Sequence, residues 1–128
     1  GAGGGRALER ARLRATPAVD LEAARVAHHV NLGLIPSSEA AWRVALMVLR
    51  PEGGVLHVHA NVGSSSSEEH IFCIHLVQTL SHLATSEAVG RAKEFSHVTV
   101  IHVERVKSYA PKVNHVVVDV HVGRVSDQ

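Results

Sequence analysis

Cysteine, aromatic residues and surplus charge are all scarce in this chain of 128 residues. The one cysteine, Cys73, cannot close an internal disulfide, which excludes a disulfide-built scaffold and favours a reducing, cytoplasmic setting. A net charge of +1 argues against a protein that coats nucleic acid, and 45% apolar residues argue against disorder. No apolar run approaches the roughly 20 residues of a membrane span, and no signal peptide opens the chain. We therefore expect one soluble domain with a substantial core.

Histidine, by contrast, is abundant, with eleven residues. His57 and His59 are two positions apart on a predicted strand, and His28 and His29 are adjacent. A zinc site needs three or four convergent ligands, usually including cysteine or carboxylate, and neither H-E-x-x-H nor C-x-x-C spacing occurs. We therefore predict no metal site. Cys73 lies in an apolar helical stretch, which favours a buried structural thiol over a nucleophile.

The first 26 residues are rich in glycine, alanine and arginine and show no clear periodicity. The chain has no initiator methionine, which suggests a fragment or an irregular N-terminus. We predict a partly disordered segment over residues 1–26, followed by one domain over residues 27–128. An alternative is a basic arm that contacts RNA phosphates, through Arg6, Arg10, Arg12 and Arg14. The initial glycine run is not a phosphate-binding loop, because no strand precedes it.

From residue 27 onwards the chain predicts regular elements. Residues 30–35 form a short apolar run typical of a buried strand. Pro36 to Glu39 then predicts a helix start, in which Ser37 or Ser38 accepts a hydrogen bond from a free backbone N–H. The helix continues with apolar residues at helical spacing and stops at residues 51–54, and we place Trp42 in its core.

The second half predicts a strand, a helix and a final pair of strands. Residues 55–60 are a strand, and Ser66 with Glu69 matches a capping box that opens a second helix. Residues 98–106 and 115–122 are rich in β-branched residues, as strands are. The order β-α-β-α-β-β predicts parallel strands that end in an antiparallel hairpin, because no helix separates the last two. This is the pattern of the C-terminal half of a Rossmann-like methyltransferase sheet.

Polar residues at the expected strand ends are the candidates for chemistry. In an open α/β sheet, ligands bind beyond the carboxyl ends of the strands. His59 and Asn61 lie at such an end, whereas we expect His57 to be packed or hydrogen-bonded under a helix. Between the last two strands, Tyr109 and Lys107 are predicted to lie in a turn.

That turn has two interpretations. It is either a simple connection that Pro111 restricts, or a site where Tyr109 stacks on a base and Lys107 meets a phosphate. On the last strand, we expect His115, Asp119 and His121 to form a buried, satisfied polar row.

Three segments together resemble one enzyme family, in the same order along the chain: VNLGLIPSSE (residues 30–39), GGVLHVHANV (residues 53–62) and RVKSYAPKVNHVVVD (residues 105–119). The family is that of the wybutosine-synthesising tRNA aminocarboxypropyltransferases, which are related to the tRNA guanine-37 N1-methyltransferases. The resemblance extends over about residues 27–122. It implies use of S-adenosylmethionine as donor of a 3-amino-3-carboxypropyl group, with no metal. The acceptor would be the modified guanosine next to the anticodon of phenylalanine tRNA.

The same resemblance implies where the ligands lie. The cofactor would lie against Gly33, Leu34, Ile35 and Pro36. The substrate would lie against Ser37, His59, Asn61, Lys107, Tyr109 and Pro111. We assign no catalytic residue.

Three departures from the patterns of the family and its relatives bear on function. The methyltransferase relatives carry an Asn where this chain has Gly33, which favours aminocarboxypropyl transfer over methyl transfer. His28 and His29 replace the usual Asp-Arg pair. No strand with an acidic end and a glycine loop precedes residue 27, so we expect the N-terminal half of the catalytic domain to be missing. A second hypothesis is therefore a non-catalytic α/β module that binds RNA or a protein partner.

Overall fold

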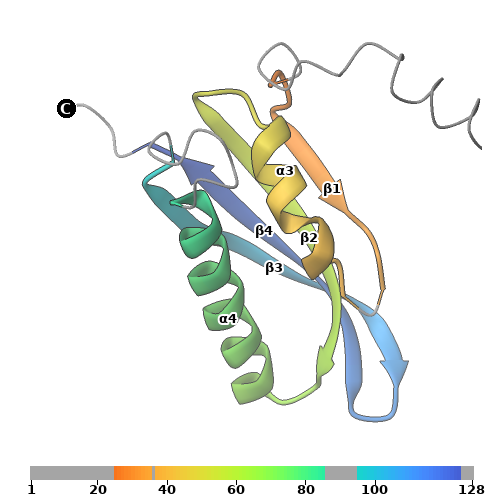
Figure 1. Cartoon of the computed structure of the whole chain (residues 1–128). Coiled ribbons are helices and arrows are strands. Elements are labelled where there is room, and N and C mark those ends of the chain that lie inside the picture. Colours follow the sequence, from red (N-terminus) through yellow and green to blue (C-terminus); the bar gives the residue numbers. More distant parts are fainter. Residues whose placement is uncertain (1–24, 36, 86–94, 125–128) are drawn as a thin grey trace, which may run out of the picture.

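The computed structural model describes residues 25–35, 37–85 and 95–124 (Figure 1). The predictions for residues 1–24, including the basic arm, and for Pro36 lie outside the described residues. The described elements follow the predicted order of strands and helices. They are β1 (His29–Leu32), the 3-10 helix η1 (Glu39–Ala41), α3 (Trp42–Val48), β2 (Gly53–Gly63), α4 (Ser66–Ala84), β3 (His97–Ala110) and β4 (Val113–Gly123).

The four strands form one mixed sheet in the order β1-β2-β4-β3. β1 pairs with β2 in parallel, whereas β4 is antiparallel to both β2 and β3. The hairpin of β3 and β4 confirms that the last two strands are antiparallel, and it places β4 between β2 and β3. The chain is therefore a small α/β domain with a four-stranded mixed sheet.

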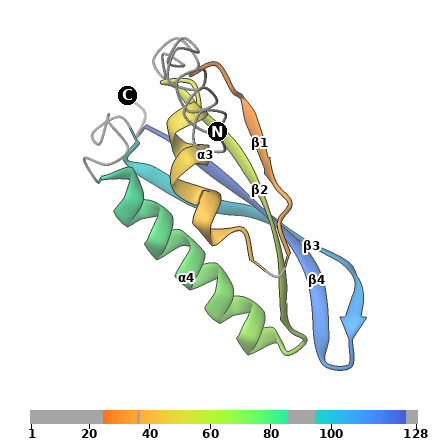
Figure 2. The ribbon, with the colours of Figure 1, turned by 45° about the vertical axis from the view of Figure 1, so that its right-hand side comes forward.

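Both helices lie on the same face of the sheet (Figures 1 and 2). Alternate residues of β2 and β4 point into this layer and are buried, as the period of two in a strand requires. The core consists of apolar side chains from all the elements, among them Trp42, Leu46, Leu56, Val58, Leu76, Leu80, Val116, Val118 and Val120. The placement of Trp42 in the core is confirmed, since its side chain is 1% exposed.

The opposite face of the sheet is polar, and none of the described helices covers it (Figure 2). On β2 it presents His57, His59 and Asn61, and on β4 it presents the predicted row of His115, Asp119 and His121. These side chains are partly exposed, so the prediction of a buried row is wrong as to burial. An antiparallel sheet with one solvated face commonly shows this alternation.

The start of α3 differs from the predicted cap. Ser37 Oγ accepts a hydrogen bond from the backbone N–H of Glu39 at 3.2 Å, as expected. Ser38 is buried and accepts from the indole N–H of Trp42 at 3.0 Å instead of capping a backbone group. The first turn is a 3-10 helix, and β1 is shorter than the predicted strand because pairing with β2 ends at Leu32.

The cap of α4 lies one residue earlier than predicted. Ser65, not Ser66, is the N-cap, and its Oγ accepts from the backbone N–H of Glu68 at 3.1 Å. The Ser65 hydroxyl also donates to Glu68 Oε1 at 2.9 Å. The capping pair is therefore Ser65 with Glu68. The run of four serines allows the helix to begin after either Ser65 or Ser66, and Ser65 is the residue that has the extended backbone of an N-cap.

The turn between the last two strands is much shorter than predicted. β3 continues to Ala110 and β4 begins at Val113, so only Pro111 and Lys112 connect them. Pro111 supplies the fixed φ of the first central position, and Lys112 has a φ of 61°. That combination is the one a type II turn requires. Lys107 and Tyr109 therefore lie in a strand, and the prediction that they lie in a turn is wrong.

Candidate site at the carboxyl edge of the sheet

Three strands bring their carboxyl ends to the same edge of the sheet. β1, β2 and β3 run in the same direction, since β1 is parallel to β2 and both β2 and β3 are antiparallel to β4. The loop after β1, the loop after β2 and the β3–β4 turn consequently lie at this edge. A hydrogen bond of 2.9 Å from the Ser64 N–H to the Lys112 carbonyl ties two of these connections together. The edge is where an α/β sheet binds its ligands.

The loop after β1 runs back along β2. Ser37 forms an isolated antiparallel bridge with Ala60, one residue after His59. Gly33, Leu34 and Ile35 are exposed, and a Cβ added to Gly33 would meet no atom within 4 Å. The structure therefore places this predicted cofactor loop next to the carboxyl half of β2, with residues 33–35 exposed.

His59 and Asn61 are partly buried beside the amino end of β4. His59 Nδ1 lies 3.0 Å from His115 Nε2, and Asn61 is opposite His115 in the β2–β4 register. The Oδ1 atom of Asn61 is buried and has no hydrogen-bond partner in the described part of the chain. Such an unsatisfied buried acceptor is costly to the folded state.

The protonation state of His59 determines the charge of the His59–His115 pair. Burial lowers the pKa of His59 below its ordinary value of 6.5, and the neighbouring His115 and His57 lower this pKa further. Asp119 acts in the opposite direction and is the weakest of these influences. His59 is thus held as a neutral ring at physiological pH, able to donate from one nitrogen and accept at the other.

Lys107 and Tyr109 project from β3 rather than from a turn. Lys107 is opposite His115 in the β3–β4 register, and Tyr109 is 59% exposed. Pro111 follows in the turn and is also exposed. The structure therefore brings these three residues to the same edge as His59 and Asn61. Their roles toward a substrate remain predictions.

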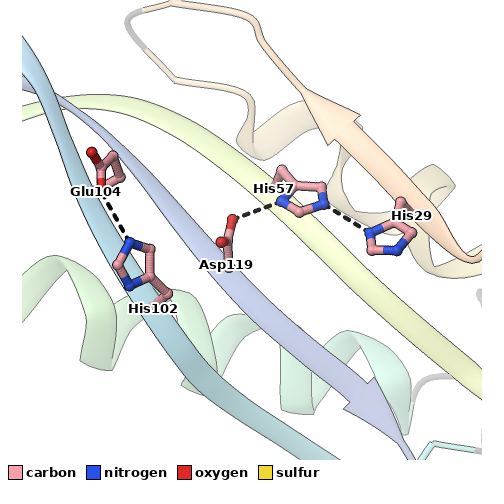
Figure 3. A network of polar contacts seen from close by, with 5 residues as sticks. All are labelled: His29, His57, His102, Glu104 and Asp119. Carbon is pink, nitrogen blue, oxygen red and sulfur yellow. Dashed lines mark hydrogen bonds and ion pairs between the residues drawn. The ribbon is translucent and has the colours of Figure 1, made fainter.

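A histidine network on the polar face was not predicted from the sequence (Figure 3). His57 Nδ1 lies 2.6 Å from Asp119 Oδ1, and His57 Nε2 lies 2.9 Å from His29 Nδ1. Because a carboxylate only accepts, His57 donates from Nδ1, and a neutral His57 then accepts at Nε2 from the Nδ1–H of His29. The rings of His29 and His57 are stacked, with centroids 5.1 Å apart. His57 is hydrogen-bonded as predicted, but it faces away from the helices.

This network could have been anticipated only from the strand register. His57 and Asp119 are direct partners in the β2–β4 pairing, 62 residues apart in the sequence. Figure 3 also shows His102 with Glu104 on β3, where the imidazole Nε2 lies 3.0 Å from Glu104 Oε2. Neither pair lies at the carboxyl edge, so we assign them no part in the candidate site.

Two further features of the described residues concern metal-ligand groups and membrane-spanning helices. Within residues 25–35, 37–85 and 95–124, no group of three or more His, Cys, Asp or Glu side chains is arranged to hold a metal ion. Among the same residues, no helix is long and apolar enough to cross a membrane. Burial, and after it Glu69, raises the pKa of the partly buried Cys73 thiol, which makes it a poor nucleophile.

Comparison with known proteins gives a consistent set of relatives. The chain is 54% identical over 95 residues to the tRNA wybutosine-synthesizing protein 2/3/4 of Arabidopsis thaliana, covering 74% of this chain and 9% of that protein. It is 35% identical over 143 residues to the tRNA wybutosine-synthesizing protein 2 homolog of Bos taurus, covering 77% and 32%. The chain therefore spans less than a third of these relatives. No family model matches it.

Solved structures share the fold. The crystal structure of M. jannaschii TYW2 in complex with AdoMet matches with a TM-score of 0.56 and 29% identity, covering 83% of this chain and 42% of that one. Trm5b from Pyrococcus abyssi matches with a TM-score of 0.54 and 20% identity, covering 77% and 26%, and this likeness concerns the fold alone. The chain thus corresponds to a part of these larger structures.

Proposed function

We propose, from the membership of this chain in the tRNA wybutosine-synthesizing protein 2 family, that it forms the acceptor-side part of an aminocarboxypropyltransferase domain in the cytoplasm. The donor would be S-adenosylmethionine, and the acceptor would be the modified guanosine next to the anticodon of phenylalanine tRNA. The observation that carries this proposal is the 54% identity over 95 residues, which is 74% of this chain.

In this reaction the main task of the protein is to position the donor and the acceptor. The sulfonium of S-adenosylmethionine supplies its own leaving group, so that a carbon–carbon bond forms at C7 of the acceptor base, the carbon–sulfur bond breaks and methylthioadenosine leaves. The acceptor carbon then loses its proton. Holding two reactants in line can account for a large share of such a barrier. Accessible backbone and small polar groups at strand ends suit that task.

The residues at the edge fit one wall of such a site. The exposed residues Gly33, Leu34 and Ile35, with Pro36 after them, would hold the cofactor, and Asn61 would lie beside the substrate. The described residues contain no glycine loop after an acidic strand end. The remainder of the cofactor site would therefore have to come from outside the described residues.

The acceptor side is assigned to the neighbouring residues. Ser37 and the neutral His59 border the edge, and the exposed ring of Tyr109 is available to stack on a base. Lys107 would contact a phosphate, and Pro111 would shape the turn beside it. These assignments position the RNA and leave the identity of a general base open.

Two other functions make different predictions. A guanine methyltransferase relative would carry an Asn at the position of Gly33, and this chain lacks it. A non-catalytic module that binds RNA or a protein partner would need no cofactor site. The two transferase alternatives differ from this module in requiring the cofactor.

Measuring cofactor binding therefore distinguishes the two transferase functions from the non-catalytic module. Isothermal titration calorimetry should be run with S-adenosylmethionine on this chain and on a version extended upstream with the corresponding residues of the Bos taurus relative. We expect binding only by the extended version. Methylthioadenosine release in the presence of tRNA would then identify aminocarboxypropyl transfer, whereas S-adenosylhomocysteine release would identify methyl transfer. Absence of binding by both proteins would refute the transferase function and favour the module.

A further inference from the structure

An open pocket lies at the carboxyl edge, on the helical side of the sheet. Its volume is about 350 Å³, within the usual range for a small-ligand pocket of about 300–1,000 Å³. It is lined by Val62, Gly63, Glu68, Ile71, Phe72 and His75. We propose that this pocket binds an unpaired nucleobase of the RNA substrate, adjacent to the acceptor nucleotide. This proposal rests on the function proposed above, because it takes the partner to be RNA.

The pocket borders the candidate site at the end of β2, on the opposite side of the sheet from the Asn61 side chain. Val62 and Gly63 are the last two residues of β2, directly after Asn61. On the other wall, His75 Nε2 lies 2.9 Å from Glu39 Oε1, which joins α4 to the turn that follows the Ser37 loop. The pocket therefore lies beside the end of β2 and beside the segment that follows Ser37.

One face of α4 supplies most of the lining. Glu68, Ile71, Phe72 and His75 are spaced i, i+3, i+4 and i+7, so they share a face of the helix. Ile71 is 63% exposed although its neighbour Phe72 packs against the core. The pocket thus has an apolar wall and two ring-bearing side chains, which is the surface that an unstacked base prefers.

The rings and the carboxylate at the opening are held in place. The His75 ring lies 5.9 Å from the Trp42 ring, and its Nε2 is occupied by Glu39, so His75 offers its ring surface rather than a hydrogen bond. Glu68 Oε1 accepts from the Ser65 hydroxyl, and Glu68 Oε2 lies where a Cβ on Gly63 would collide with it. A carboxylate has further acceptor capacity, so it selects a base with N–H donors on its free edge.

A second groove provides an internal comparison. It has a volume of about 370 Å³ and lies between α4 and the first residues of β3, lined by Cys73, Ile74, Val77, Gln78, Val98, Thr99 and Val100. It has no charged side chain and lies at the opposite end of β3 from the carboxyl edge. Ile74 is 43% exposed, which makes it a control for Ile71 on the same helix.

The test compares Ile71→Asp with Ile74→Asp in the upstream-extended version, using the release of methylthioadenosine on phenylalanine tRNA and fluorescence anisotropy with its anticodon stem-loop. Loss of one stacked base corresponds to about a tenfold weaker affinity. We expect Ile71→Asp to weaken stem-loop binding and raise KM for tRNA by about tenfold, with kcat unchanged. Glu68→Gln should weaken binding less, and Ile74→Asp should leave both values as they are.

Failure of the pocket and failure of the proposed function give different results. Equal effects of Ile71→Asp and Ile74→Asp on binding, in a protein that transfers normally, would overturn the pocket alone. Absence of both transfer and stem-loop binding in the unsubstituted extended version would overturn the function and the pocket with it. Both side chains are exposed, so the two variants should fold, and equal thermal midpoints would verify this.

Discussion

Acid should destabilise the fold through the central strand pair, and His59→Asn should remove part of this effect. The imidazole of His59 lies 3.0 Å from that of His115, between the two strands that occupy the middle of the sheet. Burial is the main cause of the lowered pKa of His59, followed by the nearby His115 and His57, while Asp119 opposes them. A proton on His59 is therefore less favourable in the folded chain than in the unfolded one.

The sign of the pH dependence follows from that shift. As the pH falls below about 6.5, the unfolded chain takes up a proton at His59 before the folded chain does. The free energy of unfolding therefore decreases from about pH 6.5 downward until the folded-state pKa is reached, and it is unaffected above this range. One proton limits the slope to about 1.4 kcal/mol per pH unit.

Urea unfolding between pH 8 and pH 4.5 would measure this slope, and proton NMR of the His59 ring would give its titration midpoint. We expect His59→Asn to lose about 1 kcal/mol at pH 8, where a hydrogen bond to His115 is lost. Between pH 6.5 and pH 5, its stability should decline less steeply than that of the unsubstituted chain. A midpoint for His59 at or above 6.5, or equal slopes for the two proteins, would refute the assignment. His70→Asn, on the exposed side of α4, is the control.

Two further predictions concern local structure and use matched pairs of variants. Ser65→Ala should lower the free energy of unfolding by about 1 kcal/mol, because Ser65 caps α4 through the Glu68 N–H. Ser66→Ala should change this free energy by less than about 0.5 kcal/mol, and equal losses for the two variants in urea unfolding would contradict the observed cap. Gly53→Ala should lower the free energy of unfolding by more than about 2 kcal/mol, since Gly53 has a φ of 92° and a Cβ there would collide with the β4 backbone. Gly33→Ala should leave this free energy nearly unchanged, because a Cβ there meets no atom. Thermal midpoints that fall equally in both variants would contradict this prediction.

The order of elements was predictable because local patterns determine it. Period-two alternation and β-branched residues identify the strands, and apolar residues at helical spacing identify the helix around Trp42. The antiparallel hairpin followed from the absence of a helix between the last two strands. The placement of His59 and Asn61 at a carboxyl edge followed in turn, because strand direction alone decides which end of a strand meets the loops.

Features that depend on pairing were not predictable in the same way. Lys107 and Tyr109 follow a run of β-branched residues and precede Pro111, which locally reads as a turn. Pairing with β4 extends β3 to Ala110 in spite of three register irregularities. The contact of His57 with Asp119 likewise depends on register, so no local pattern indicates it.

The polar face of the sheet bears on whether folding and activity can be separated. The core is built on one face only, by alternate apolar residues of β2 and β4 with both helices over them. On the other face, the hydrogen bonds of His57 with Asp119 and of His59 with His115 satisfy part of the polar surface without a covering layer.

A two-layer arrangement of this kind has its own apolar core within the described residues, so we expect cooperative unfolding of this chain by itself. Cofactor binding has a different requirement, because under the proposed function the described residues contribute a single wall at the carboxyl edge. The same protein should therefore unfold in one cooperative transition and yet show no heat of binding with S-adenosylmethionine. A non-cooperative urea transition would show instead that the fold needs further structure to cover the polar face of the sheet.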